Sequence, residues 1–171
     1  SGGSTNAALH LPAIANEAGI NFTLEDVTKI SKKTPYIADL KPGGKYVAKD
    51  LYEIGGVPVL IKALLDGGLL HEDCMTVTGK TIGENHKNII FPSNQKVIYK
   101  TSKPLSSSGG FVGLKGNLAP EGAIVKVAGM KRRKFVGKAK CFDGESSALA
   151  AVLDRKIKPG DVIVIRYEGP K

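Results

Sequence analysis

A glycine pair followed by hydrogen-bonding side chains stands at the start of the chain. Two glycines, Gly2 and Gly3, precede Ser4, Thr5 and Asn6, three side chains that can form hydrogen bonds. Glycine lets a backbone come close to a ligand, and the free amides at the start of a helix attract anions. Ser, Thr and Asn are also the usual N-cap residues. We therefore interpret the motif first as a helix N-cap and second as an anion site.

Metal chemistry has one candidate, His71-Glu72-Asp73-Cys74. A zinc site normally takes four ligands in two spaced pairs, and no second pair follows. His10 and His86 have no obvious partners. Cys74 and Cys141 are the only cysteines, and nothing indicates an oxidising compartment, so we expect two free thiols. No Ser-His-Asp arrangement, phosphate loop or dinucleotide fingerprint occurs. Residue types alone therefore leave the function open.

Charge divides the chain into two halves. Residues 1–86 hold eight basic and ten acidic residues, for a net charge of −2, whereas residues 87–171 hold seventeen and six, for +11. Such asymmetry suggests an anionic partner. The main basic cluster is Lys131-Arg132-Arg133-Lys134, but only Phe135 lies near it for stacking on bases. A solvated turn explains the cluster, so nucleic acid is not the expected partner. A basic module that binds anions or nucleic acid remains the alternative.

Membrane insertion and secretion have no support in the sequence. The chain has 171 residues, of which 42% are apolar and 24% charged, as in a soluble globular protein. No apolar run approaches the ~20 residues that span a bilayer. The first residues show no secretory signal. We expect a cytoplasmic protein, or one of an organellar matrix or stroma if the source is eukaryotic.

Helical patterns dominate the first half. Thr23 before Glu25 and Asp26 predicts a helix start, and Thr34-Pro35 predicts its end. Val27 and Ile30 would face the core. Pro12 is the difficulty in an earlier helix, which either starts at this proline or contains it. The remaining expected elements are helices over 7–18, 46–54 and 58–66, the last stopped by Gly67-Gly68, and a brief strand over 74–79.

The second half is typical of strands. After a connector rich in Ser and Pro, strands are expected over 111–116, 123–127, 135–142 and 161–167, with a helix over 145–155. Ala148, Leu149, Val152 and Leu153 would form the buried face of this helix. The order strand-strand-strand-helix-strand indicates an α+β domain or a small barrel.

Several strings in this order resemble one family, the dihydroxy-acid and phosphogluconate dehydratases. Each string is modest, but together they cover nearly the whole chain. They are Gly2-Gly3-Ser4-Thr5-Asn6 with Leu9-His10-Leu11; Gly55-Gly56-Val57-Pro58; Asp66-Gly67-Gly68-Leu69-Leu70; Gly79-Lys80-Thr81-Ile82-Gly83-Glu84-Asn85; Gly116-Asn117-Leu118-Ala119-Pro120-Glu121-Gly122-Ala123; and Gly160-Asp161-Val162 with Ile165-Arg166-Tyr167-Glu168-Gly169-Pro170-Lys171. The stretches 114–122 and 166–171 look like the dihydroxy-acid branch rather than the phosphogluconate branch.

The resemblance implies a hydro-lyase. Such enzymes remove water from a 2,3-dihydroxy acid to give a 2-keto acid in branched-chain amino-acid biosynthesis. An iron–sulfur cluster with an open iron acts on the leaving 3-hydroxyl, a magnesium ion partly held by a carbamylated lysine orients the substrate, and a serine alkoxide removes the proton from carbon 2. A sugar-acid dehydratase of the same family is the alternative.

The resemblance also implies that this chain is an internal fragment. The cluster cysteines and most magnesium ligands would precede Ser1, and one magnesium glutamate and the serine base would follow Lys171. We therefore expect no catalytic or metal-binding residue here, no bound cofactor, and no activity of the fragment alone. Only Ser4, Thr5, Asn6, Arg166 and Glu168 would border the substrate pocket. The resemblance implies that the parent acts on a small dihydroxy acid and forms a homodimer.

The implied architecture is α+β. Residues 1–86 would be the helical tail of an α/β N-terminal domain, residues 87–110 a linker, and residues 111–171 the first part of a β-rich, barrel-like C-terminal domain. The change of net charge near residue 87 agrees with this division.

Overall fold

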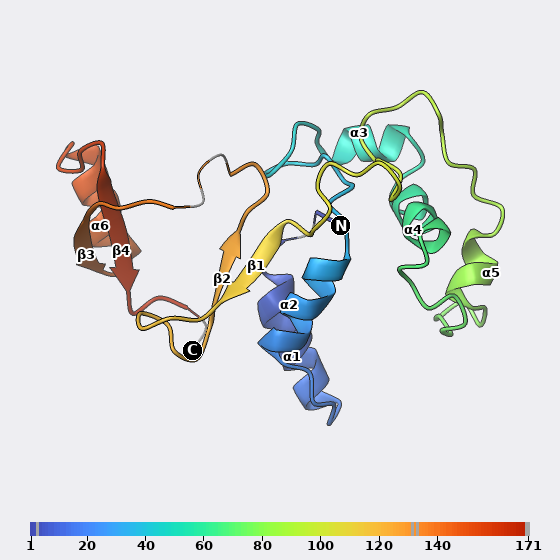
Figure 1. Ribbon diagram of the computed structural model, residues 1–171, viewed down its shortest axis with the longest axis horizontal. Coiled ribbons are helices and arrows are strands. Elements are labelled where there is room, and N and C mark those ends of the chain that lie inside the picture. The colour runs from blue at the N-terminus through green and yellow to red at the C-terminus, as the bar shows by residue number, and fades with distance from the viewer. Residues whose placement is uncertain (3, 131, 133, 170–171) are drawn as a thin grey trace. The chain divides into compact units, whose positions relative to one another are not determined.

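The computed structural model describes residues 1–2, 4–130, 132 and 134–169. The chain forms two compact units, Ser1–Met130 and Lys131–Lys171, which we describe separately (Figure 1). Two residues of the expected basic cluster, Lys131 and Arg133, lie outside the described part. In the part that is described, no helix has the length and apolar character needed to cross a membrane.

Five helices and one hairpin make up the described part of the first unit. The hairpin is antiparallel and pairs Phe111 with Lys126 and Leu114 with Ala123. The elements are α1 (Ala7–Glu17), α2 (Leu24–Lys33), α3 (Ala48–Glu53), α4 (Val57–Asp66), α5 (Ile82–His86), β1 (Phe111–Leu114) and β2 (Ala123–Lys126). Helices α1 to α4 and both strands confirm expected elements, with ends that shift by a few residues, whereas the sequence did not predict α5. The strand expected over 74–79 is wrong, because the described backbone there makes only an isolated bridge between Met75 and Thr81.

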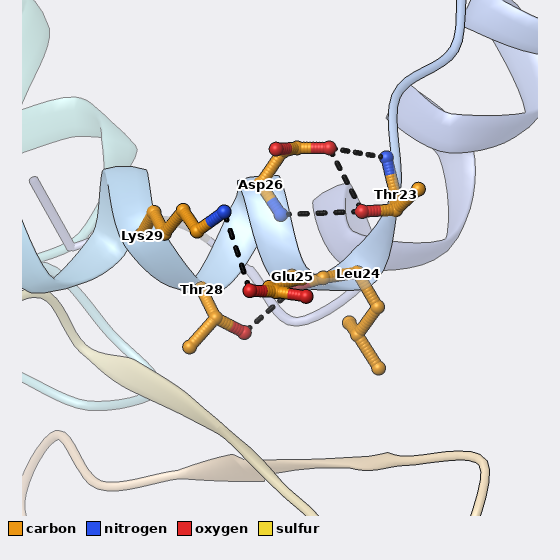
Figure 2. A network of polar contacts seen from close by, with 6 residues as sticks. All are labelled: Thr23, Leu24, Glu25, Asp26, Thr28 and Lys29. Atoms are coloured by element: carbon orange, nitrogen blue, oxygen red, sulfur yellow. Dashed lines mark hydrogen bonds and ion pairs between the residues drawn. The ribbon is translucent and has the colours of Figure 1, made fainter.

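Local signals set the limits of α2. The hydroxyl of Thr23 accepts a hydrogen bond from the N–H of Asp26 at 3.4 Å, and the Asp26 carboxylate accepts from the N–H of Thr23 at 2.9 Å. Figure 2 shows this capping box together with the Lys29–Glu25 ion pair, 3.2 Å long, one turn further on. The reciprocal bonds satisfy amides that the first helical turn leaves free. The predicted start of α2 is confirmed.

The core of the first unit joins segments that are far apart in sequence. Its fully buried centre is Ile37 and Ile98, and Ala38, Ala63, Leu64 and Val97 surround it. The N–H of Asp39 donates to the carbonyl of Val97 at 2.8 Å, and the N–H of Tyr99 donates to the carbonyl of Ile37 at 2.8 Å. The stretch expected to be a linker therefore contributes two core residues and pairs with the chain after α2.

A close contact fixes the hairpin against α2. The hydroxyl of Ser31 donates to the carbonyl of Phe111 at 2.7 Å, and the N–H of Gly109 donates to the carbonyl of Ser31 at 2.8 Å. Ser31 is buried, whereas Ile30, expected to face the core, is 53% exposed. A β-carbon on Gly113 would lie only 2.1 Å from the hydroxyl oxygen of Thr28. Small residues let helix and strand approach, which explains why the polar Ser31 is buried in place of Ile30.

The second unit contains a parallel strand-helix-strand arrangement. Strand β3 (Lys138–Asp143) pairs with β4 (Asp161–Arg166), and α6 (Glu145–Leu153) connects them. Lys140 and Asp161 form an ion pair of 2.8 Å between the strands. This order confirms the sequence prediction, although β3 begins three residues later than expected. Mixed helix and strand content agrees with an α+β class, and the described strands form two two-stranded sheets and no closed barrel.

The buried face of α6 differs from the prediction. Ala148 and Ala151 are buried, but Leu149, Val152 and Leu153 are 55%, 47% and 72% exposed. The helix packs on only two strands, so the small alanines fill the contact and the larger apolar side chains stay outside it. The prediction is correct for Ala148 and wrong for the other three.

Candidate functional site

Ser4, Thr5 and Asn6 form the turn that starts α1. The N–H of Ala7 donates to the carbonyl of Ser4 at 3.1 Å, and the N–H of Ala8 donates to the carbonyl of Thr5 at 3.0 Å. Asn6 stands at the N-cap position with helical backbone angles and makes no capping hydrogen bond with its side chain. The predicted helix start is confirmed, but the Asn6 side chain does not cap the helix.

Pro12 lies inside α1 rather than at its start. The ring removes one backbone donor from the helix. The helix nevertheless continues to Glu17, and Gly19 follows with a left-handed φ of +69°, as expected of a glycine just past a helix end. The sequence left both possibilities open, and the helix contains the proline.

The residues before α1 are held against the chain that follows α2. The carbonyl of Ser1 accepts from the N–H groups of Ile37 and Ala38, at 3.2 and 3.0 Å. Gly2 has a φ of +117°, and a β-carbon there would lie 2.6 Å from the ring of Tyr36. Glycine is thus required at this position for both backbone and space. These contacts determine where the Ser4–Asn6 turn begins.

Tyr36 is a polar residue of this region that sequence reasoning did not select. Its side chain is buried, and its hydroxyl has no hydrogen-bond partner among the described residues. Burial raises the pKa of the Tyr36 hydroxyl, and the nearby Asp39 charge raises it further. The neutral phenol therefore persists at physiological pH, and no local sequence signal distinguishes it from an ordinary core tyrosine.

Arg166 and Glu168 lie together at the carboxyl end of β4, in the second unit. The Arg166 guanidinium places Nε 2.7 Å and Nη2 2.5 Å from one carboxylate oxygen of Asp143, at the end of β3. Glu168 Oε1 accepts a hydrogen bond of 2.6 Å from the N–H of Glu145, the first residue of α6. The structure thus brings these two predicted residues together with two that the sequence did not indicate.

The histidines, cysteines and acidic residues that the sequence offered for metal binding do not form a centre in the described part of the chain. Among residues 1–2, 4–130, 132 and 134–169, no group of three or more His, Cys, Asp or Glu side chains is arranged to hold a metal ion. Cys74 and Cys141 are both free and exposed. His86 contacts the carbonyl of Ile82 in its own helix through Nδ1 at 2.8 Å. The described residues therefore do not by themselves fit an iron–sulfur cluster, which protein thiolates normally hold, or a magnesium ion.

Two residues of the His71–Cys74 stretch line a polar cleft. It has a volume of about 490 Å³ and lies between α4 and α5. Glu72 and Asp73 line it together with Asp66, Glu84 and His86. Asp66 already forms an ion pair of 2.5 Å with Lys62, and Glu84 accepts the N–H of Thr81 in a capping box. Two of the four acidic groups that line the cleft, Asp66 and Glu84, thus serve local structure.

Comparison with known proteins identifies the family of the chain. Residues 1–85 match the family model described as dihydroxy-acid/6-phosphogluconate dehydratase N-terminal, and residues 96–171 match the corresponding C-terminal model. The chain belongs to the dihydroxy-acid/6-phosphogluconate dehydratase family. The resemblance inferred from the ordered strings is confirmed.

Individual members of the family match along the whole chain. Dihydroxy-acid dehydratase 2 of Bradyrhizobium diazoefficiens is 64% identical over 171 residues, which is 100% of this chain and 30% of that protein. The dihydroxy-acid dehydratase of Pelagibacter ubique is 67% identical over 169 residues, covering 99% of this chain and 30% of its own length. That of Saccharolobus islandicus is 53% identical over 172 residues, with 99% and 31% covered. The chain therefore spans about 30% of the length of these curated relatives.

Proposed function

We propose that this chain is a segment of a dihydroxy-acid dehydratase, a hydro-lyase that converts 2,3-dihydroxy-3-methyl acids to 2-keto acids. The observation that carries the proposal is the match of 53–67% identity to relatives of that name over at least 99% of the chain. The matched segment includes parts of both family regions. The role in branched-chain amino-acid biosynthesis follows from that activity.

Within such an enzyme the chain would supply structure around the substrate rather than reacting groups. We propose that Ser4, Thr5 and Asn6, at the positive end of α1, border the substrate pocket, since a helix start suits the carboxylate of a dihydroxy acid. Arg166 and Glu168, in the second unit, are likewise proposed as residues at the border of the substrate. The iron–sulfur cluster and Mg²⁺ of the enzyme supply Lewis-acid chemistry when bound, and residues outside this chain would hold them.

The domain division remains part of the proposal. Residues 1–86 would end the α/β N-terminal domain, residues 87–110 would connect it to the next, and residues 111–171 would begin a barrel-like C-terminal domain. The full enzyme would work as a homodimer on a small dihydroxy acid, in the cytoplasm or in an organellar matrix. The family models, which end and resume at residues 85 and 96, support this order.

A graft tests the proposed activity. The 171 matching residues of the Bradyrhizobium enzyme are replaced by this chain, and the reconstituted hybrid is assayed with 2,3-dihydroxy-3-methylbutanoate and with 6-phosphogluconate. The unaltered Bradyrhizobium protein is the control. We expect turnover of the dihydroxy acid and none of the sugar acid. A folded, metal-loaded hybrid that prefers 6-phosphogluconate would support the sugar-acid alternative, and one that acts on neither would contradict the proposal.

A further inference from the structure

The carboxyl ends of two parallel strands meet the start of α6 in the second unit. Asp143 and Arg166 are the last pair in the register of β3 with β4, and Gly144 follows as the N-cap of α6. In parallel sheets with connecting helices, ligands bind outside the carboxyl ends of the strands. The chain leaving β4 at this edge is Tyr167-Glu168-Gly169, part of the proposed pocket border.

Glu168 takes the place of a capping side chain for α6. Gly144 stands at the N-cap with a φ of +95° and has no side chain to accept a hydrogen bond. The carboxylate of Glu168 accepts the N–H of Glu145 instead, at 2.6 Å. A carboxylate at this end of a helix also benefits from the helix dipole. The cap thus comes from a residue 23 positions later in the chain.

Two further contacts hold the same segment. The N–H of Gly144 donates to the carbonyl of Arg166 at 3.1 Å, and the Arg166 guanidinium binds Asp143. Between these attachments, Tyr167 adopts a left-handed backbone with a φ of +59°, which is uncommon for a residue with a side chain. Such a conformation persists where the surroundings impose it. The attachments on both sides of Tyr167 therefore determine the direction in which the chain leaves β4.

We propose that Glu168 is a positioning residue that acts by capping α6, and that it does not contact the substrate. Its hydrogen bond to Glu145 holds the segment after β4 in place at the border of the substrate pocket. The proposal rests on the proposed function for the pocket itself. The Glu168 carboxylate is then already bound to the N–H of Glu145 before the substrate binds.

The test separates the acceptor from its donor. In the grafted enzyme, Glu168→Ala removes the acceptor, and Glu145→Pro removes the donor, because proline has no N–H and is tolerated at the first helical position. Glu145→Ala keeps the N–H and is the matched control. From the usual strength of an N-cap, each of the two disruptive variants should raise the opening equilibrium of the first turn of α6 about fivefold, and kcat should fall while KM changes little. The double variant should be no worse than either one, and Glu168→Gln, which keeps an acceptor oxygen, should recover part of the loss.

A second measurement does not depend on activity. Hydrogen exchange should quicken in the Glu168→Ala variant, and less in Glu168→Gln, at the amides of Glu145, which donates to Glu168, and Ala148, which donates to the carbonyl of Gly144. An unchanged exchange rate in Glu168→Ala would refute the proposal that Glu168 caps α6, whether or not the grafted enzyme turns over substrate. Normal kinetics in Glu145→Pro beside a raised KM in Glu168→Ala would instead mean direct substrate contact. If the grafted enzyme without further substitutions is inactive, only the proposed function is refuted, because the exchange experiment still tests whether Glu168 caps α6.

Discussion

Ser31 offers the most direct test of how the first unit is assembled. The substitution Ser31→Ala removes the hydroxyl that donates to the carbonyl of Phe111 at 2.7 Å, across 80 residues of sequence. The serine is 7% exposed, so water does not readily replace the lost donor. Losing the hydrogen bond and leaving a carbonyl without this partner should cost about 1–2 kcal/mol. That corresponds to a roughly 5- to 30-fold larger unfolding equilibrium constant.

Urea unfolding of the 171-residue chain, followed by circular dichroism, measures this cost. The matched control is Ser107→Ala, which makes the same chemical change at an exposed serine. Substitutions at such surface positions usually change the free energy of unfolding by less than about 0.5 kcal/mol. If the Ser31→Ala and Ser107→Ala proteins unfold at the same urea concentration, the contact between α2 and β1 does not contribute to stability and the reasoning fails.

Three further changes probe other parts of the same unit. The pKa of Asp26 is lowered by the hydrogen bond from the N–H of Thr23 and then by that from its hydroxyl. The capping box therefore stabilises the fold above the ordinary carboxyl pKa and is lost as the pH falls through the lowered one. Asp26→Asn should flatten the stability–pH curve on the acid side, as thermal unfolding between pH 3 and 6 would reveal; an unchanged curve would contradict this. Gly67→Ala would place a β-carbon 2.5 Å from the hydroxyl oxygen of Thr101 and should cost about 1–3 kcal/mol in urea unfolding, partly recovered by Thr101→Ala; no cost would show that the neighbour moves freely. Ile37→Ala, at a fully buried side chain, should cost about 2–5 kcal/mol, and a loss below about 1 kcal/mol would refute the assignment of the core.

Sequence reasoning succeeded where the signal is local. The limits of α2 follow from Thr23 and its first-turn acids at one end and from Thr34-Pro35 at the other, and the structure places the helix at Leu24–Lys33. The same holds for α4, which ends before Gly67. Caps, prolines and glycines act within one turn of chain, so their effects can be inferred from neighbouring residues.

The errors concern partners that are distant in sequence. The helical pattern places Ile30 on the core face, but the approach of β1 favours the smaller side chain of Ser31. The amphipathic pattern of residues 145–155 predicts a buried Leu149, but the two described strands are too narrow to cover it. The partners of Arg166 and Glu168 were missed for a similar reason, since 23 residues separate each pair of contacts. The family resemblance drew attention to Arg166 and Glu168 but carried no information about what they bind within the protein.

The core of the first unit has a consequence for dividing the protein at the gene level. Val97 and Ile98 belong to the stretch matched by the C-terminal family model, yet they pack with Ile37 and Ala38 from the N-terminal one. A gene split between residues 86 and 96 would separate the two halves of one hydrophobic core. Each product would expose apolar surface when made alone, and the two would become soluble partners only when produced together. The family boundary, useful for recognising the sequence, is thus a poor place to cut the chain.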